Sequence, residues 1–328
     1  ALTGGSDCDP IDEILGKCDH EKSELRSKLQ KLGWQMLDCS YGYGKRDSAA
    51  VAYSALLASG VNISKEDYAR QFVSDTISHE IGHCLGLRHN FIASTNLTTE
   101  QLADEATVRE QGISASVMDY VPVNLSAVLK GSGSFYAPNI GAYDKWAIEY
   151  GYSDKAGAPP ELERTALARI ASRGNQPGLR YMTDEDADSV DPLVVRFDNS
   201  KDPLKYIEQQ MVAYKRIRDY AIAKLPKPGE SYATRTNLLL NSTVRQLASA
   251  GDAAAFVGGV LGNRNFRGDY AEQPTLQPVP SDRQRQAMRL IGRFALTSKA
   301  VTLPPASVLN NLSLDYNTGD GSGNVAPI

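Results

Sequence analysis

The chain has 328 residues, of which 41% are hydrophobic, enough for the packed core of one large domain or two smaller ones. Its formal net charge of -4 gives no basic surface for nucleic acid, and no stretch approaches the roughly twenty apolar residues that cross a bilayer. We therefore expect a globular protein with neither a nucleic-acid nor a membrane partner.

Residues 1–45 are predicted to be a helical N-terminal segment, because apolar residues recur at helical spacing between positions 10 and 32. The cysteines are at positions 8, 18, 39 and 84, and they allow two disulfides in three connectivities that the sequence does not distinguish. Ala1 is preceded by neither an initiator Met nor a signal peptide, which indicates a processed or excised fragment.

A long helix is predicted to begin after Ser64, which is followed three residues later by Asp67, a pattern typical of a helix start. We expect its apolar residues to form one stripe along the helix as far as Gly86. They are Tyr68, Phe72, Ile77, Ile81 and Leu85.

The end of this helix carries the run HEIGHCLGLRH from position 79 to 89. Residues four apart share one helix face, so His79 and His83 present both imidazoles to one point. Gly86 can take the left-handed conformation that ends a helix, which lets His89 return to the same point. Three histidines leave the fourth position of a zinc ion open to water, as in catalytic zinc sites. Glu80 can reach that water as a general base without binding the metal.

When an HExxH pattern occurs alone, the ordinary interpretation is two helix histidines whose hydrogen bonds are satisfied. Three of the four histidines in the chain, however, fall in this one window at the spacing H-E-x-x-H-x-x-G-x-x-H. We therefore favour the metal site over the ordinary interpretation.

A methionine turn is predicted at Ser116-Val117-Met118-Asp119-Tyr120. With the histidine window, it resembles the metzincin peptidases, in which a Met forms a hydrophobic floor beneath the metal. In the astacin-like and serralysin-like metzincins, a Tyr two residues after the Met approaches the metal and hydrogen-bonds the tetrahedral intermediate. The resemblance implies these roles for Met118 and Tyr120.

Residues 140–152 have aromatic residues at helical spacing, which predicts a buried helix against the active-site region. Asp144 within this helix needs a partner if it is buried, and we expect it to anchor the turn or a chain end. The acidic residues from Asp184 to Asp191 are a candidate Ca²⁺ site, but they lack EF-hand spacing, and we favour a solvated acidic loop.

Amphipathic helices are predicted at 202–224, at about 230–249 and at 281–298, with no further histidine. We expect an α+β, mostly helical protein with a zincin/metzincin-like catalytic core and a helical C-terminal subdomain. The predicted division is an N-terminal helical segment at 1–45, a metzincin-like catalytic region at 46–195 and the helical subdomain at 196–328.

The chain is similar to large bacterial zinc-dependent metalloproteases of the Met-zincin family. That resemblance implies zinc at His79, His83 and His89, Glu80 as the base, protein or peptide substrates, and a secreted, periplasmic or cell-surface location. It is carried by His79–Phe91, Ser116–Tyr120, Gly141–Tyr152, Tyr181–Asp188, Asp202–Leu204 and Val257–Val260 with Arg264 and Gly268.

One departure from the metzincin pattern concerns the sheet that precedes the active-site helix and pairs with an extended substrate. Before Ser64 the strand signal is limited to about 33–41, so we expect a fragment lacking its upper subdomain. Two alternatives to a zinc endopeptidase therefore stay open. One is a catalytically incomplete metal-binding scaffold, and the other is a zinc amidase acting on a non-peptide substrate.

Overall fold

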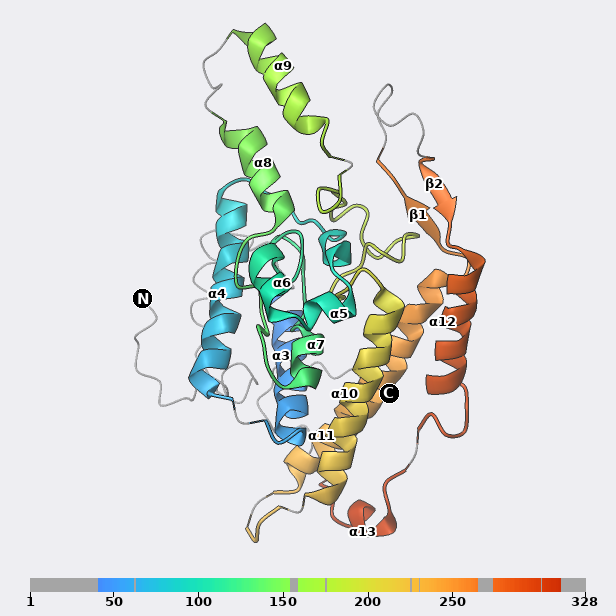
Figure 1. Cartoon of the computed structure of the whole chain (residues 1–328). Coiled ribbons are helices and arrows are strands. Elements are labelled where there is room, and N and C mark those ends of the chain that lie inside the picture. The colour runs from blue at the N-terminus through green and yellow to red at the C-terminus, as the bar shows by residue number, and fades with distance from the viewer. Residues whose placement is uncertain are drawn as a thin grey trace, which may run out of the picture.

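The computed structural model describes residues 41–313, except 62, 154–158, 175, 225, 230, 265–273 and 302. This part of the chain is mostly helical, as predicted (Figure 1). Its elements are α3 (Tyr41–Ala58), α4 (Lys65–Cys84), η1 (Ala93–Asn96), α5 (Thr99–Leu102), α6 (Glu105–Gln111), α7 (Leu125–Lys130), α8 (Ala142–Tyr152), α9 (Pro160–Ala171), α10 (Pro203–Ala223), α11 (Ala233–Asp252), η2 (Ala253–Phe256), β1 (Val260–Gly262), β2 (Leu276–Pro278), α12 (Ser281–Phe294) and α13 (Ala306–Leu309).

Helix α4 begins at the predicted cap, where Ser64 Oγ accepts the backbone N–H of Asp67 at 3.2 Å. After Cys84 the chain reaches Gly86, whose φ of +83° lies in the left-handed region that glycine adopts without strain. The helix therefore ends there and the chain turns back toward it.

The prediction of one apolar stripe along α4 is wrong for the second half of the helix. Tyr68 is buried, but Ile77, Ile81 and Leu85 are exposed, and His79 and Gly82 occupy the buried positions instead. The step from Phe72 to Ile77 is five residues, which rotates the apolar positions by about 140° away from the first ones. Two separate apolar faces therefore exist on α4.

The largest core cluster joins α3, α4 and α7 to α10. Tyr68 is fully buried there, where its hydroxyl donates to Ala49 O at 3.0 Å and accepts from the Tyr136 hydroxyl at 3.1 Å. Lys45 of α3 is also buried, and it forms an ion pair with Asp75 of α4. These contacts fix α3 against α4, the helix that carries the histidines.

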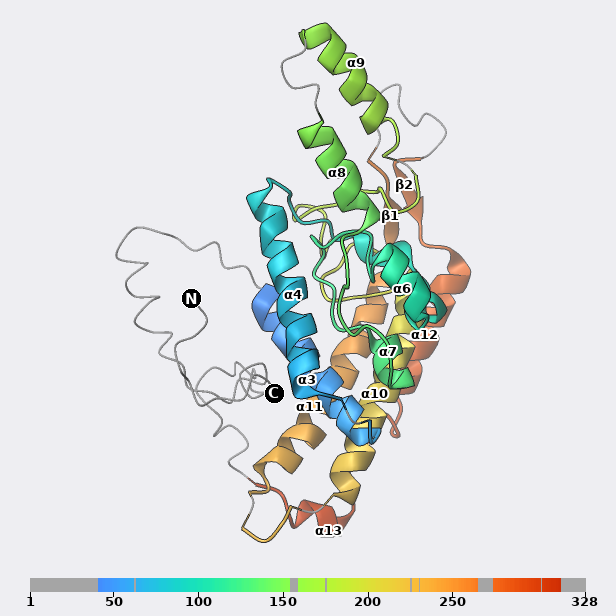
Figure 2. The same cartoon turned by 60° about the vertical axis from the view of Figure 1, so that its left-hand side comes forward.

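Helices α10, α11 and α12 correspond to the three amphipathic helices predicted in the last third of the chain and lie side by side (Figures 1 and 2). Arg235 of α11 is buried and donates to Ala221 O and Ile222 O, both at 2.8 Å. These bonds satisfy carbonyls at the end of α10 that have no partner within the helix. The subdomain boundaries of the sequence-based division stay predictions.

The sheet within the described residues consists of β1 and β2, which pair antiparallel with Val260 opposite Pro278 and Gly262 opposite Leu276. Gly258 before β1 has φ +74°, in the left-handed region that glycine adopts without strain. Residues 33–40 of the strand-like run and the cysteines at 8, 18 and 39 lie outside the described residues, and Tyr41 begins α3.

Among the described helices, none has the length and apolar character needed to cross a bilayer. The secreted, periplasmic or cell-surface location stays a prediction.

Gly141, at the start of α8, provides a test of how tightly this helix is held. A Cβ at Gly141 would overlap the backbone of Ala115, whereas one at Gly151 in the same helix would meet nothing within 4 Å. We expect Gly141→Ala to lower the free energy of unfolding by about 3 kcal/mol or more, because backbone must move. Gly151→Ala should be neutral or stabilise by up to about 1 kcal/mol. Urea unfolding of both variants measures the difference, and equal effects would contradict the packing.

Candidate metal centre

The three histidines of the window converge at the C-terminal end of α4. His79 and His83 come from the helix, and His89 comes from the chain that returns after Gly86. One ligand atom of each residue lies within 4.8 Å of the others, and His83 Nε2 is 3.1 Å from His89 Nε2. Within the described residues, these side chains form the group that could hold a metal ion.

The Nδ1 atoms of both helix histidines face backbone carbonyl oxygens. His79 Nδ1 lies 2.7 Å from Val117 O, and His83 Nδ1 lies 3.0 Å from Leu87 O. A carbonyl oxygen only accepts hydrogen bonds, so each Nδ1 must carry the proton. The Nε2 atom of each ring is then left with the lone pair that binds a metal.

His89 is oriented by a side chain far away in the sequence. Its Nδ1 lies 2.8 Å from Asp184 Oδ1, which gives the carboxylate–histidine arrangement that orients metal ligands and raises their basicity. The adjacent Arg88 donates to Glu185 at 2.9 Å. The loop that carries these two acids is thereby fastened to the chain that holds the third ligand.

These contacts change the interpretation of the acidic stretch at 184–191. Asp184 binds His89, Glu185 binds Arg88, Asp186 pairs with Arg264 and Asp188 pairs with Arg196. The structure therefore gives no support to Ca²⁺ at this stretch. The acids of this loop are largely exposed, in keeping with a solvated acidic loop, but Asp184 also hydrogen-bonds His89 of the candidate metal centre.

The donor set fits a zinc ion. With Nδ1 protonated, the Nε2 lone pairs of His83 and His89 point at each other across 3.1 Å, which is unfavourable unless they share a cation. Two nitrogens bound to one tetrahedral zinc ion would be about 3.3 Å apart, since each Zn–N bond is about 2.0 Å. Burial lowers the pKa of His79 to about 3 and also lowers the pKa of His89, which keeps both rings in the neutral, metal-binding form.

Met118 lies beneath the histidines, against the backbone of α4. It is fully buried, and a Cβ at Gly82, between the two helix ligands, would overlap its sulfur. Met118 O also accepts the N–H of Asn90 at 3.0 Å, next to the third ligand. The glycine at position 82 thus lets the methionine side chain approach the helix closely.

Asp144 anchors the turn that carries Met118, in agreement with the expectation that this acid needs a partner. Its carboxylate accepts the Ser116 hydroxyl at 2.6 Å, the Val117 N–H at 2.9 Å and the Gly141 N–H at 2.8 Å. The carbonyl of the same Val117 accepts from His79. One residue of the turn therefore links a buried carboxylate to a candidate metal ligand.

Tyr120 lies beside the ligand rings. Its ring centroid is 4.7 Å from that of His89 and 5.6 Å from that of His79, and the residue is buried. The N–H of Phe197 donates to Tyr120 O at 2.9 Å. The backbone of Tyr120 is therefore held by Phe197, and its ring is held against the rings of His89 and His79.

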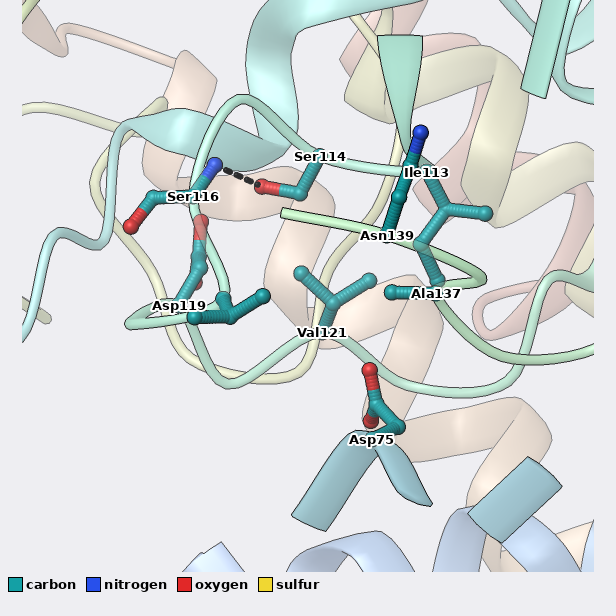
Figure 3. Close-up of a pocket in the computed structure, with 9 residues that line it drawn as sticks. Asp75, Ile113, Ser114, Ser116, Asp119, Val121, Ala137 and Asn139 are labelled. Atoms are coloured by element: carbon teal, nitrogen blue, oxygen red, sulfur yellow. Dashed lines mark hydrogen bonds between the residues drawn. The ribbon is translucent and has the colours of Figure 1, made fainter. Parts of the chain in front are cut away.

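Glu80 is exposed on α4, one residue beyond His79. A small cavity of about 10 Å³ has room for about one water molecule and is lined by Asp75 and Asp119 among others (Figure 3). A second cavity, of about 320 Å³, is lined by residues of α3, α10 and α11. Neither of these two cavities contains Glu80 or a histidine, so neither is the space in which Glu80 would act.

Two buried carboxyl groups lie behind Tyr120. Burial raises the pKa of Asp198 to about 8, and burial next to Asp198 raises the pKa of Asp119 well above its usual range. Both side chains are more than nine-tenths buried. At neutral pH the protonated form of Asp198 therefore predominates in the folded protein.

The sequence did not reveal the residues that orient the ligands. Asp184 is 95 positions from His89, and Val117 acts through a backbone carbonyl that has no residue-specific signal. The density of acids at 184–188 predicted a solvated acidic loop and gave no sign that one of these acids hydrogen-bonds a histidine.

Removal of the Asp184 carboxylate should weaken metal binding. We expect Asp184→Ala to lower zinc affinity by about 10-fold or more, because His89 loses the acceptor that fixes its tautomer and orientation. Glu185→Ala is the matched control, since this neighbouring acid binds Arg88 and not a histidine. Zinc competition with a chromophoric chelator measures both variants. Equal losses in the two would contradict the assigned role.

Asp198→Asn should change how stability depends on pH. The folded pKa of Asp198, about 8, lies above the unfolded value of about 3.9, so its stabilising effect is complete at low pH and is lost as pH rises through 8. Relative to the parent, the Asn variant should gain stability between about pH 4 and 8, by up to about 1.4 kcal/mol per pH unit. Urea unfolding of both proteins at several pH values measures this difference. If the free energies of unfolding of parent and variant change with pH in parallel, Asp198 does not titrate as described.

Comparison with known proteins agrees with the geometry of this centre. Searches of curated proteins and of solved structures give no significant match. A family model described as Met-zincin matches residues 62–326, which is more than half of the chain and includes the histidine window and the methionine turn. The chain therefore belongs to the Met-zincin family.

Proposed function

We propose that the protein is a zinc-dependent endopeptidase. The observation that supports this most directly is the convergence of three imidazoles whose Nδ1 atoms are all held by oxygen acceptors. Three neutral nitrogen donors suit zinc and leave one coordination position for water or substrate. Family membership points to the same metal and to protein or peptide substrates.

Zinc held by these histidines would supply Lewis acidity, polarising the scissile carbonyl and lowering the pKa of a water toward 7. Glu80 acts as the general base: its carboxylate takes a proton from the attacking water and passes it to the leaving amine. Its exposed position, one residue from His79, supports this role, since the carboxylate is accessible to substrate from solvent.

Tyr120 stabilises the negative charge that develops on the carbonyl oxygen, by donating its hydroxyl proton in a hydrogen bond. Its ring already packs on His89 and His79, so little reorganisation is needed to place the hydroxyl near the reacting carbonyl. Donors of this kind contribute a few kcal/mol to transition-state binding in other enzymes.

One observation favours the alternative of an incomplete catalytic unit. The outer face of α4, next to Glu80, has exposed aliphatic side chains and lacks a sheet edge within the described residues with which an extended peptide could pair. Under this alternative zinc would bind, but hydrolysis would be weak. A zinc amidase acting on a non-peptide substrate would use the same residues.

The test is digestion of an unfolded protein such as casein by the parent and by Glu80→Gln at matched zinc content. We expect the variant to be at least about 100-fold slower, because it cannot accept the proton of water. Glu66→Gln is the control, since Glu66 is also an exposed carboxylate of α4 but lies in its first turn.

Cleavage by the parent and by Glu66→Gln, with loss in Glu80→Gln, would establish the peptidase. Equal cleavage by all three would remove Glu80 from the mechanism. Zinc binding without cleavage of casein or of a peptide library would favour the incomplete unit, and release of ammonia or an amine from small amides would favour the amidase.

A further inference from the structure

Four aromatic rings lie against the buried ring of Tyr120. The centroids of His89 and His79 are 4.7 and 5.6 Å from that of Tyr120. Those of Phe91 and Phe197 are 5.0 and 5.5 Å away. Because the two histidines are candidate metal ligands, the two phenylalanines are the rings of this group that are free to serve Tyr120.

The two phenylalanines differ in what else they contact. The ring of Phe91 also lies 5.1 Å from that of His89, so a change at Phe91 disturbs a candidate ligand together with Tyr120. Among the ring contacts of the described residues, Phe197 meets Tyr120 and none of the histidines. Phe197 is therefore the ring through which Tyr120 can be affected while the candidate ligands stay in place.

Phe197 has a backbone conformation that a bulky residue rarely adopts. Its φ is +63°, in the left-handed region, and Ser200 in the same loop has φ +97°. Conformations of this kind persist only where the surrounding structure dictates them, and they cluster at functional sites. The contacts of Phe197 therefore determine its shape more than its local preference does.

Those contacts lead to Tyr120 and to the ring beside it. The N–H of Phe197 donates to Tyr120 O at 2.9 Å. The preceding Arg196 holds its guanidinium 4.9 Å from the centre of the Phe91 ring and forms an ion pair with Asp188. Phe197 is thus joined to Tyr120 through both its backbone and its ring.

On another side, Phe197 borders open space. It lines the cavity of about 320 Å³, together with Tyr206 and Tyr214 of α10. Close packing alone therefore does not confine this ring, as it would in a filled core. The hydrogen bond to Tyr120 O and the contact between the two rings have to keep it in place.

We propose that Phe197 is a positioning residue for Tyr120: its ring fixes the Tyr120 side chain where the hydroxyl can serve the reacting carbonyl. A donor stabilises developing charge only if it is held in place before the reaction, which is why a fixed ring matters. The kinetic consequence rests on the proposed peptidase function, whereas the restraint on the Tyr120 ring does not.

The test is a double-mutant cycle on casein cleavage by the zinc-loaded full chain. We expect Phe197→Ala to lower kcat by about 10-fold or more and to change KM by less than about 3-fold, because the lost interaction acts in the transition state. In a Tyr120→Phe background the same substitution should change kcat by less than about 3-fold, since no hydroxyl is left to position.

Two further variants separate positioning from general loss of structure. Phe256→Ala removes a buried ring from a different core cluster, and it should leave kcat within about 3-fold of the parent. Phe197→Tyr keeps the ring and should likewise retain kcat within about 3-fold. Zinc content should match the parent throughout, because the ring of Phe197 meets Tyr120 and not a candidate ligand.

Circular dichroism checks that each variant is folded, and Phe197→Leu replaces Phe197→Ala in the cycle if the alanine variant is not. Equal losses of kcat with and without the Tyr120 hydroxyl would overturn the proposal, because Phe197 would then act on the fold as a whole. An unchanged kcat in the folded variant would overturn it as well.

Fluorine NMR provides a readout that needs no peptidase activity. The chain is labelled with 3-fluorotyrosine, and Tyr120 is identified by the signal that Tyr120→Phe removes. The two orientations of a held ring should give separate signals in the parent. We expect exchange between them to be about 10-fold faster or more in Phe197→Ala, and unchanged in Phe256→Ala, because only the first variant frees the ring.

This second readout distinguishes failure of the positioning from failure of the proposed function. Equal exchange rates in the parent and in Phe197→Ala would overturn the positioning, whether or not casein is cleaved. Faster exchange in Phe197→Ala, in a protein that cleaves neither casein nor a peptide library, would support the positioning and count against the peptidase alone.

Discussion

The convergence of three neutral imidazoles is the constraint on which the rest of the centre depends. Nitrogen lone pairs directed at one point repel each other unless a cation lies among them, so the fold has to hold the rings in place. It does so through Val117 O, Leu87 O and the Asp184 carboxylate, one acceptor for each Nδ1. Burial favours the neutral rings of His79 and His89, which is the form that binds a metal.

The acceptors are supplied by three different parts of the chain. Leu87 belongs to the turn after α4, Val117 to the methionine turn and Asp184 to the acidic loop. Asp144, at the start of α8, accepts a hydrogen bond from Val117 and so fixes the methionine turn. Gly141, next to α8, approaches the Ala115 backbone too closely for a side chain. The orientation of the candidate ligand His79 and the packing of α8 are therefore linked through the backbone of Val117.

Helix α4 shows how one element serves two surfaces. Its buried face carries His79 and Gly82, and the glycine leaves room for the fully buried Met118. Its outer face carries aliphatic residues that the described chain leaves exposed. Glu80, the proposed base, is exposed on this same helix, next to His79 of the buried face and Ile81 of the outer face.

The sequence by itself determined the chemistry of the centre. The spacing of His79, His83 and His89 specified three convergent nitrogen donors, because helix periodicity and a glycine turn are local properties. Helical periodicity also located α10, α11 and α12. The tertiary structure alone decided that Asp184 orients His89, that Val117 orients His79, and which apolar face of α4 is buried. Those outcomes depend on contacts between residues tens of positions apart, and no local pattern encodes such contacts.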